Sequence, residues 1–97
     1  MNLFDALALP NGSTVPNRIA KAAMEENMAD ADHAPSEHLI RLYQAWAEGG
    51  AGLLISGNVM VDSRAMTGPG GVVLEDDAQL ARFEHWARVG RAKGAQF

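Results

Sequence analysis

A near-continuous apolar run, AGLLIS at residues 51–56, constrains the fold of this chain more than any other feature of its sequence. Apolar side chains at successive positions, instead of alternate ones, are typical of a strand that is buried on both faces. Strands of that kind occur in parallel sheets, whose faces are covered by helices. The run therefore predicts a parallel strand in an α/β fold.

A helix is predicted immediately before this strand. Ser36 can cap its first turn, and the acidic Glu37 suits the positive end of the helix dipole. Gly49-Gly50 is expected to end the helix, because glycine adopts the left-handed backbone conformation without a steric penalty. The apolar residues between these signals recur at helical spacing and predict one buried stripe: Leu39, Leu42, Tyr43 and Trp46.

A second helix is predicted after the strand. Asp76 or Asp77 is expected to cap it, and Gly94 is expected to end it. Gly90 lies inside this helix, at a cost in helix stability. The buried face is predicted to consist of four residues at helical spacing: Leu80, Phe83, Trp86 and Ala87.

The remaining segments complete an alternating order of strands and helices. Residues 3–9 and 14–15 are predicted to form a hairpin around Asn11-Gly12. Residues 17–24 are predicted to form a strand, and residues 95–97 the first step of another. Alternating strands and helices favour a parallel sheet with right-handed crossovers.

Two long loops, residues 25–34 and 57–71, follow the predicted strands, whereas the connections from helix to strand are short. In parallel α/β folds the chemistry is located at the carboxyl ends of the strands. The order of elements therefore predicts that residues 24–34 and 57–71 form the functional face.

Length and composition exclude several classes of protein. The chain has 97 residues, whereas a complete (β/α)8 barrel needs about 250. The absence of cysteine excludes disulfides, thiolate zinc sites and thiol nucleophiles. A net charge of −4 without a basic cluster argues against a nucleic-acid partner, and no apolar stretch has the length of a membrane span. We therefore expect a cytoplasmic protein without nucleic-acid or membrane partners. The predicted third strand is cut short, which would leave an unpaired sheet edge, so we expect this chain to be the opening part of a larger protein.

Three short motifs, in order and with matching gaps, carry a resemblance to a known family. Asn17-Arg18 begins the first predicted parallel strand, and Ala22-Ala23-Met24 ends it. The segment GGAGLLI, which starts at Gly49, then leads into the next strand. This ordered set resembles the start of the Old Yellow Enzyme family of NADH:flavin oxidoreductases and NADH oxidases, over residues 3–96.

The resemblance implies an α/β fold that is the N-terminal part of a (β/α)8 TIM barrel, with an N-terminal β-hairpin and truncated at the third strand. Residues 1–97 would form one partial FMN-binding domain. The implied activity is the transfer of a hydride from NADH or NADPH, through FMN, to a small-molecule activated alkene such as an enone or enoate. The resemblance leaves open whether the complete protein is a homo-oligomer. The chain alone is expected to be inactive.

The resemblance also implies cofactor-binding residues, but no catalytic residue, within this stretch. Backbone groups at the end of the first parallel strand would contact the flavin ring, and a small residue after the next strand would contact its polar edge. Many relatives have Pro in place of Ala23, and Cys or Thr in place of Glu25. The implied flavin-contacting residues are Ala22, Ala23, Met24, Glu25 and Gly57.

Two other interpretations stay open beside this one. The chain could be a small stand-alone α/β module that binds or assembles without catalysis, or part of a different phosphate-binding barrel. Glu25 and Glu26 are predicted to be solvated surface carboxylates and not an acid–base pair. No metal site is expected, because the spacing of the three histidines does not match a zinc motif: His33, His38 and His85.

Overall fold

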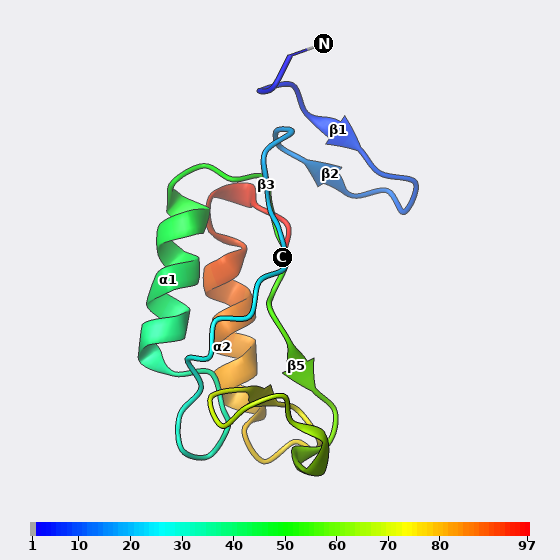
Figure 1. Ribbon diagram of the computed structural model, residues 1–97. Helices are drawn as coiled ribbons and strands as arrows, with labels where there is room; N and C mark the ends of the chain where they lie inside the picture. Colours follow the sequence, from blue (N-terminus) through cyan, green and yellow to red (C-terminus); the bar gives the residue numbers. More distant parts are fainter. Residues whose placement is uncertain (1) are drawn as a thin grey trace.

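Two helices lie side by side and pack against short parallel strands in the computed structural model, which describes residues 2–97 (Figure 1). The helices are α1 (Glu37–Glu48) and α2 (Leu80–Gly90). Within residues 2–97, no helix has the length and apolar character needed to cross a membrane. Two 3₁₀ helices are η1 (Ser63–Ala65) and η2 (Ala92–Gly94). The strands are β1 (Leu7–Ala8), β2 (Thr14–Val15), β3 (Ala20–Lys21), β4 (Leu53–Leu54), β5 (Val59–Met60) and β6 (Val72–Val73).

β3 and β4 form a parallel pair, as the apolar run predicts, with Lys21 opposite Leu54. On the far side of β4, Gln96 forms a parallel bridge with Leu53. The Gln96 carbonyl accepts a hydrogen bond from the N–H of Leu54 at 2.8 Å. The predicted alternation of helices and parallel strands is therefore confirmed, and residues 95–97 begin a third strand beside β4.

The sequence signals at both ends of α1 act as predicted. The Ser36 side chain accepts a hydrogen bond from the N–H of Leu39 at 3.0 Å. Gly50 follows the helix with a φ of +107°, which is the left-handed conformation expected at its end. The buried side differs in part from the predicted stripe, because Leu42 and Trp46 are only half-buried. The buried residues of α1 are Leu39, Ile40, Tyr43 and Ala47.

Neither Asp76 nor Asp77 caps α2, so that prediction is wrong. The Asp76 carboxylate accepts from the N–H of Ala78 at 2.9 Å and thereby closes a turn before the helix. Gln79 occupies the N-cap position without a side-chain hydrogen bond. Leu80, predicted to be buried, is 45% exposed, because the helix begins there instead of a turn earlier.

α2 ends at Gly90 and not at Gly94, because the backbone leaves α-helical geometry at Arg91 (φ −98°, ψ 8°). The short helix η2 follows, with left-handed conformations at Lys93 and Gly94. Gly90 has a packing role that the sequence does not reveal. A Cβ atom at position 90 would lie 2.8 Å from the ring of Phe97. The glycine therefore allows the last residues of the chain to approach the end of the helix closely.

The segment 57–71, predicted to be a loop, contains a strand and a 3₁₀ helix. β5 pairs in parallel with β6, with Val59 opposite Val72. The N–H of Val73 donates to the His33 carbonyl at 2.9 Å. These bonds hold the segment after β4 against the loop after β3.

The core lies between the two helices and one side of the strands. The Tyr43 ring packs edge-on against the Trp86 ring at 5.2 Å, and the Phe97 ring lies equally close to Tyr43. Leu54 faces this core and is 1% exposed, whereas Ile55 is 45% exposed. Side chains alternate along a strand, and both helices pack on a single side. The prediction of burial on both faces is therefore wrong within residues 2–97.

β1 and β2 form the predicted antiparallel hairpin, which projects away from the helices (Figure 1). The N–H of Gly12 donates to the Leu9 carbonyl at 3.0 Å, and Gly12 has a φ of +89°. This is the pattern of a short loop that ends in a left-handed glycine. The Gln96 side chain donates to the Thr14 carbonyl at 3.1 Å and connects the hairpin to the end of the chain.

Candidate functional site

The predicted flavin-contacting residues lie at the carboxyl ends of two neighbouring parallel strands. Residues 22–25 directly follow β3, and Gly57 comes soon after β4. Residues 22–25 are exposed, and Gly57 is half-buried. Because this end of a parallel sheet is where α/β proteins bind ligands, the five residues lie where a ligand site is expected.

Gly57 and Met24 are brought into direct contact. A Cβ atom on Gly57 would overlap the carbonyl oxygen of Met24 and would lie 2.5 Å from Oε1 of Glu26. The absence of a side chain at position 57 therefore lets the segments after β3 and β4 meet. Met24 itself is 52% exposed.

The backbone that follows β3 carries open hydrogen-bonding groups. Among residues 2–97, no protein group forms a hydrogen bond with the backbone N–H or C=O of Ala23, Met24 or Glu25. Exposed backbone groups can bind a ligand without any contribution from a side chain. The side chains of Ala22 and Ala23 are single methyl groups, so they leave the approach to this backbone open.

The Glu25 side chain contacts the segment between η1 and β6. Its Oε1 accepts a hydrogen bond from Oγ1 of Thr67 at 2.7 Å. This bond ties the two predicted functional segments, 24–34 and 57–71, to each other. The carboxylate is therefore engaged by a hydroxyl group of the neighbouring loop.

A buried polar cluster of Lys21, Glu26 and Tyr43 adjoins this face. Lys21 Nζ donates to Tyr43 Oη at 2.8 Å, to Glu26 Oε2 at 3.3 Å and to the Ile55 carbonyl at 2.5 Å. The Tyr43 hydroxyl donates to the same Glu26 oxygen at 2.5 Å. The side chains of Lys21 and Glu26 are 5% and 10% exposed. The cluster connects α1 with the ends of β3 and β4.

Glu26 is not the solvated surface carboxylate that its polar surroundings in the sequence predict. Its partner Tyr43 lies on a helix that begins eleven positions further on, and that pairing is set by the fold. The one sequence signal is Lys21, a charged residue within a short apolar strand. Its ammonium group lies 4.9 Å from the ring centre of Tyr43 and 5.1 Å from that of Trp46.

Burial raises the pKa of Tyr43 above its ordinary value of 10, and the hydrogen bond and charge of Glu26 raise this pKa further. A hydrogen bond with the Gly57 backbone acts in the opposite direction. The phenol is therefore neutral near pH 7 and can donate to the Glu26 carboxylate. Tyr43 thus contacts groups from both segments of the candidate site.

The later part of the loop after β3 is fastened to α2. Arg82 Nη1 donates to Asp32 Oδ2 at 3.0 Å, and Arg82 Nη2 donates to the Pro35 carbonyl at 2.8 Å and to the Asp30 carboxylate. This part of the loop therefore packs against the helix, whereas residues 24–26 stay beside Gly57.

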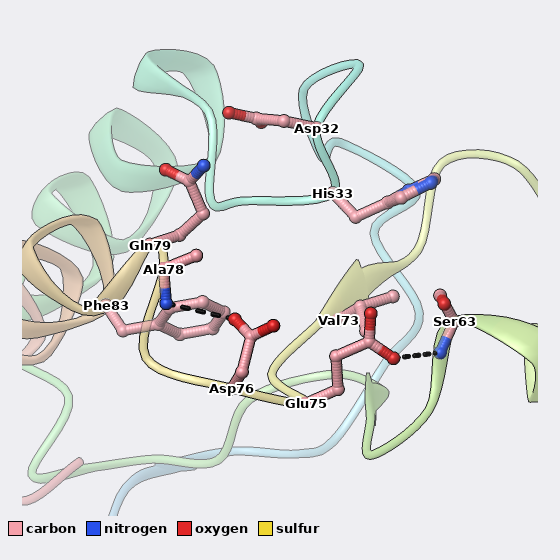
Figure 2. A pocket seen from close by; sticks show the side chains of 9 residues that line it. All are labelled: Asp32, His33, Ser63, Val73, Glu75, Asp76, Ala78, Gln79 and Phe83. Carbon is pink, nitrogen blue, oxygen red and sulfur yellow. Dashed lines mark hydrogen bonds between the residues drawn. The ribbon is translucent and has the colours of Figure 1, made fainter.

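A separate pocket of about 160 Å³ lies between the loops (Figure 2). Its Glu75 carboxylate accepts from the N–H of Ser63 at 2.8 Å, and its Asp76 carboxylate accepts from the N–H of Ala78. Glu75 therefore fastens the segment after β6 to η1, whereas Asp76 closes a turn within its own segment. None of the predicted flavin-contacting residues lines the pocket, whose lining consists of Asp32, His33, Ser63, Val73, Glu75, Asp76, Ala78, Gln79 and Phe83.

The chain is similar in sequence to flavin enzymes. No family model matches it. It is 37% identical over 92 residues to the NADH-dependent flavin oxidoreductase iliE of Hypocrea jecorina, a match that covers 91% of this chain and 23% of that protein. It is 35% identical over 96 residues to the NADH oxidase of Thermoanaerobacter brockii, covering 98% of this chain and 15% of that protein. The chain thus spans less than a quarter of the length of either relative.

The fold is similar to that of the Old Yellow Enzyme homologue from Zymomonas mobilis. The TM-score is 0.84 at 26% sequence identity, over 98% of this chain and 26% of that chain. Structures of this kind are TIM barrels, in which parallel strands alternate with helices as they do here. In sequence and in fold, the chain is therefore similar to the N-terminal portion of flavin oxidoreductases of the Old Yellow Enzyme family.

Proposed function

We propose that this chain is the opening part of an FMN-dependent (β/α)8 barrel, ending in the third strand. The complete protein would transfer a hydride from NADH or NADPH, through FMN, to an activated alkene such as an enone or enoate. The names of the similar proteins support a flavin and a nicotinamide. The alkene as substrate follows from the family resemblance alone.

The observation that carries this proposal is the exposed backbone beyond β3. Ala23, Met24 and Glu25 offer N–H and C=O groups that have no partner among residues 2–97. The methyl side chains of Ala22 and Ala23 leave room for a planar ring to approach that backbone. Since one edge of the flavin ring carries both donors and acceptors, these residues fit the cofactor.

The role of the chain in this proposal is to bind and orient the flavin. Bound FMN supplies the hydride chemistry. The backbone of Ala23, Met24 and Glu25 would contact the ring. Gly57 would contact its polar edge and keep the segments after β3 and β4 in contact. Hydrogen bonds at that edge also adjust the reduction potential of a flavin.

No residue of this chain is proposed as the proton donor to the alkene. Tyr43 is the only tyrosine, and its hydroxyl donates to Glu26 within the core. The Glu25 carboxylate accepts from Thr67. We therefore assign proton donation, substrate binding and phosphate binding to other parts of the complete barrel.

The test is the flavin content and turnover of the full-length protein. The purified protein is expected to carry noncovalent FMN that loses its absorbance when NADH or NADPH is added without oxygen. A simple enone, added next, is expected to restore the oxidised spectrum. A protein that binds no FMN contradicts the proposed cofactor, and bound FMN that no enone or enoate reoxidises contradicts the proposed substrate class.

A further inference from the structure

The hydrogen-bond ladder between β3 and β4 stops before its regular continuation. In a parallel pair, a residue of one strand bonds to the residues on both sides of its neighbour. The N–H of Ile55 donates to the Lys21 carbonyl at 3.1 Å, so the next regular bond would run from the N–H of Ala23 to the Ile55 carbonyl. Within residues 2–97 that bond is absent.

The Lys21 side chain takes the place of the missing bond. Its ammonium group donates to the Ile55 carbonyl at 2.5 Å. The same group donates to Tyr43 and to Glu26, so each of its three protons has an acceptor. With only 5% of the side chain exposed, the ammonium group is fixed at the end of the ladder.

We infer that Lys21 is a positioning residue that ends the β3–β4 ladder and so holds the backbone of Ala23, Met24 and Glu25 out of the sheet, open to the flavin. The inference rests on the proposed function. It gives a role to a residue that does not itself touch the cofactor. A proline at position 23 would also end the ladder, because proline has no N–H to donate to the Ile55 carbonyl.

The double substitution Lys21→Met with Glu26→Gln removes both charges at similar side-chain length, so neither charge is left buried alone. In the apo form of the full-length protein, the Ile55 carbonyl then becomes free to accept from Ala23. Hydrogen exchange at the Ala23 amide is expected to be fast in the wild type and slow in the double variant. The Kd for FMN is expected to rise about tenfold or more, the equivalent of one lost hydrogen bond.

A matched control removes an exposed side-chain pair on α1, outside the candidate site. The Gln44 side chain donates to Glu48 Oε1 at 3.2 Å, and both residues are exposed. Gln44→Met with Glu48→Gln is expected to leave Ala23 exchange and the FMN Kd at wild-type values. The same change in both double variants would contradict a specific role for Lys21.

The remaining outcomes separate this inference from the proposed function. The wild-type protein can bind FMN while the double variant shows an unchanged Kd and unchanged Ala23 exchange. That result overturns the inference and leaves the proposed function standing. If the double variant does not fold, the wild-type apo protein decides, because a slowly exchanging Ala23 amide contradicts the inference and a fast one supports it. A wild-type protein that binds no FMN contradicts the proposed function, and the inference with it.

Discussion

Gly57 lies so close to the carbonyl oxygen of Met24 that a Cβ atom at position 57 would overlap it. This contact joins the segments that follow β3 and β4. Gly57→Ala is therefore expected to force these segments apart and to lower the free energy of unfolding by about 1–3 kcal/mol, the range for overpacking. Chemical denaturation of the full-length protein measures this change.

Gly68→Ala is the matched control, because the nearest atom to a Cβ at position 68, Oδ1 of Asn27, would be 3.9 Å away. This substitution is expected to change the free energy of unfolding by less than about 0.5 kcal/mol. Equal losses at Gly57 and Gly68 would show that the contact with Met24 is not responsible.

Gly90 in α2 faces the ring of Phe97, which a Cβ atom would approach to 2.8 Å. Alanine improves helix propensity by about 1 kcal/mol, but overpacking costs about 1–3 kcal/mol. Gly90→Ala is therefore expected to destabilise the chain in the wild-type background and to be neutral or stabilising in a Phe97→Leu background. A double-mutant cycle measured by denaturation checks the coupling, and the same effect in both backgrounds contradicts it.

Tyr43 is expected to make stability depend on pH in the alkaline range. Its pKa in the folded chain is raised above 10 by burial and by Glu26, so the neutral phenol stabilises the folded state. This contribution is fully present below pH 10 and is lost as the pH rises above 10, where the unfolded chain releases the proton first.

Because Tyr43 is the only tyrosine in the chain, tyrosinate absorbance reports on it alone. The folded chain is expected to titrate at higher pH than the same chain in denaturant. A Tyr43→Phe variant is expected to lose the alkaline decrease in stability that this titration produces. Coincident titration curves for the folded and unfolded chains would contradict the buried contact with Glu26.

The isolated 97-residue chain is expected to bind FMN weakly or not at all, because barrels of this type bind phosphate after their seventh and eighth strands. Titration followed by flavin fluorescence measures this. Micromolar binding with quenched fluorescence would overturn the expectation. A cooperative thermal melt together with a defined oligomer would support the alternative of a stand-alone binding or assembly module.

Much of the fold is predictable from local signals. Ser36, the helical spacing from Leu39 to Trp46 and the glycines after α1 act over a few residues, and so they predict the bounds of that helix, although its buried side differs in part from the predicted stripe. The pairing of β5 with β6 is not predictable in this way. These strands are two residues long and lie in a segment rich in turn-forming residues, so only the tertiary hydrogen bonds reveal them.

Part of the candidate site is likewise predictable from the sequence, and part of it is not. The position of residues 22–25 beside Gly57 follows from strand order, because neighbouring parallel strands end at the same edge of a sheet. The burial of Glu26 does not, because its neighbours in the sequence are polar and its two partners lie on β3 and α1. The unpaired backbone of Ala23 likewise depends on where one lysine side chain lies, which no periodicity encodes.

The central claim is that residues 22–25 and Gly57 contact the flavin in the complete protein. Residue-resolved hydrogen exchange of the full-length protein, with and without FMN, tests it most directly. We expect FMN to slow exchange at the amides of Ala23, Met24 and Glu25, and to leave the exposed surface of α2 unchanged. FMN that binds to the protein without slowing exchange at any of these three amides would contradict the account.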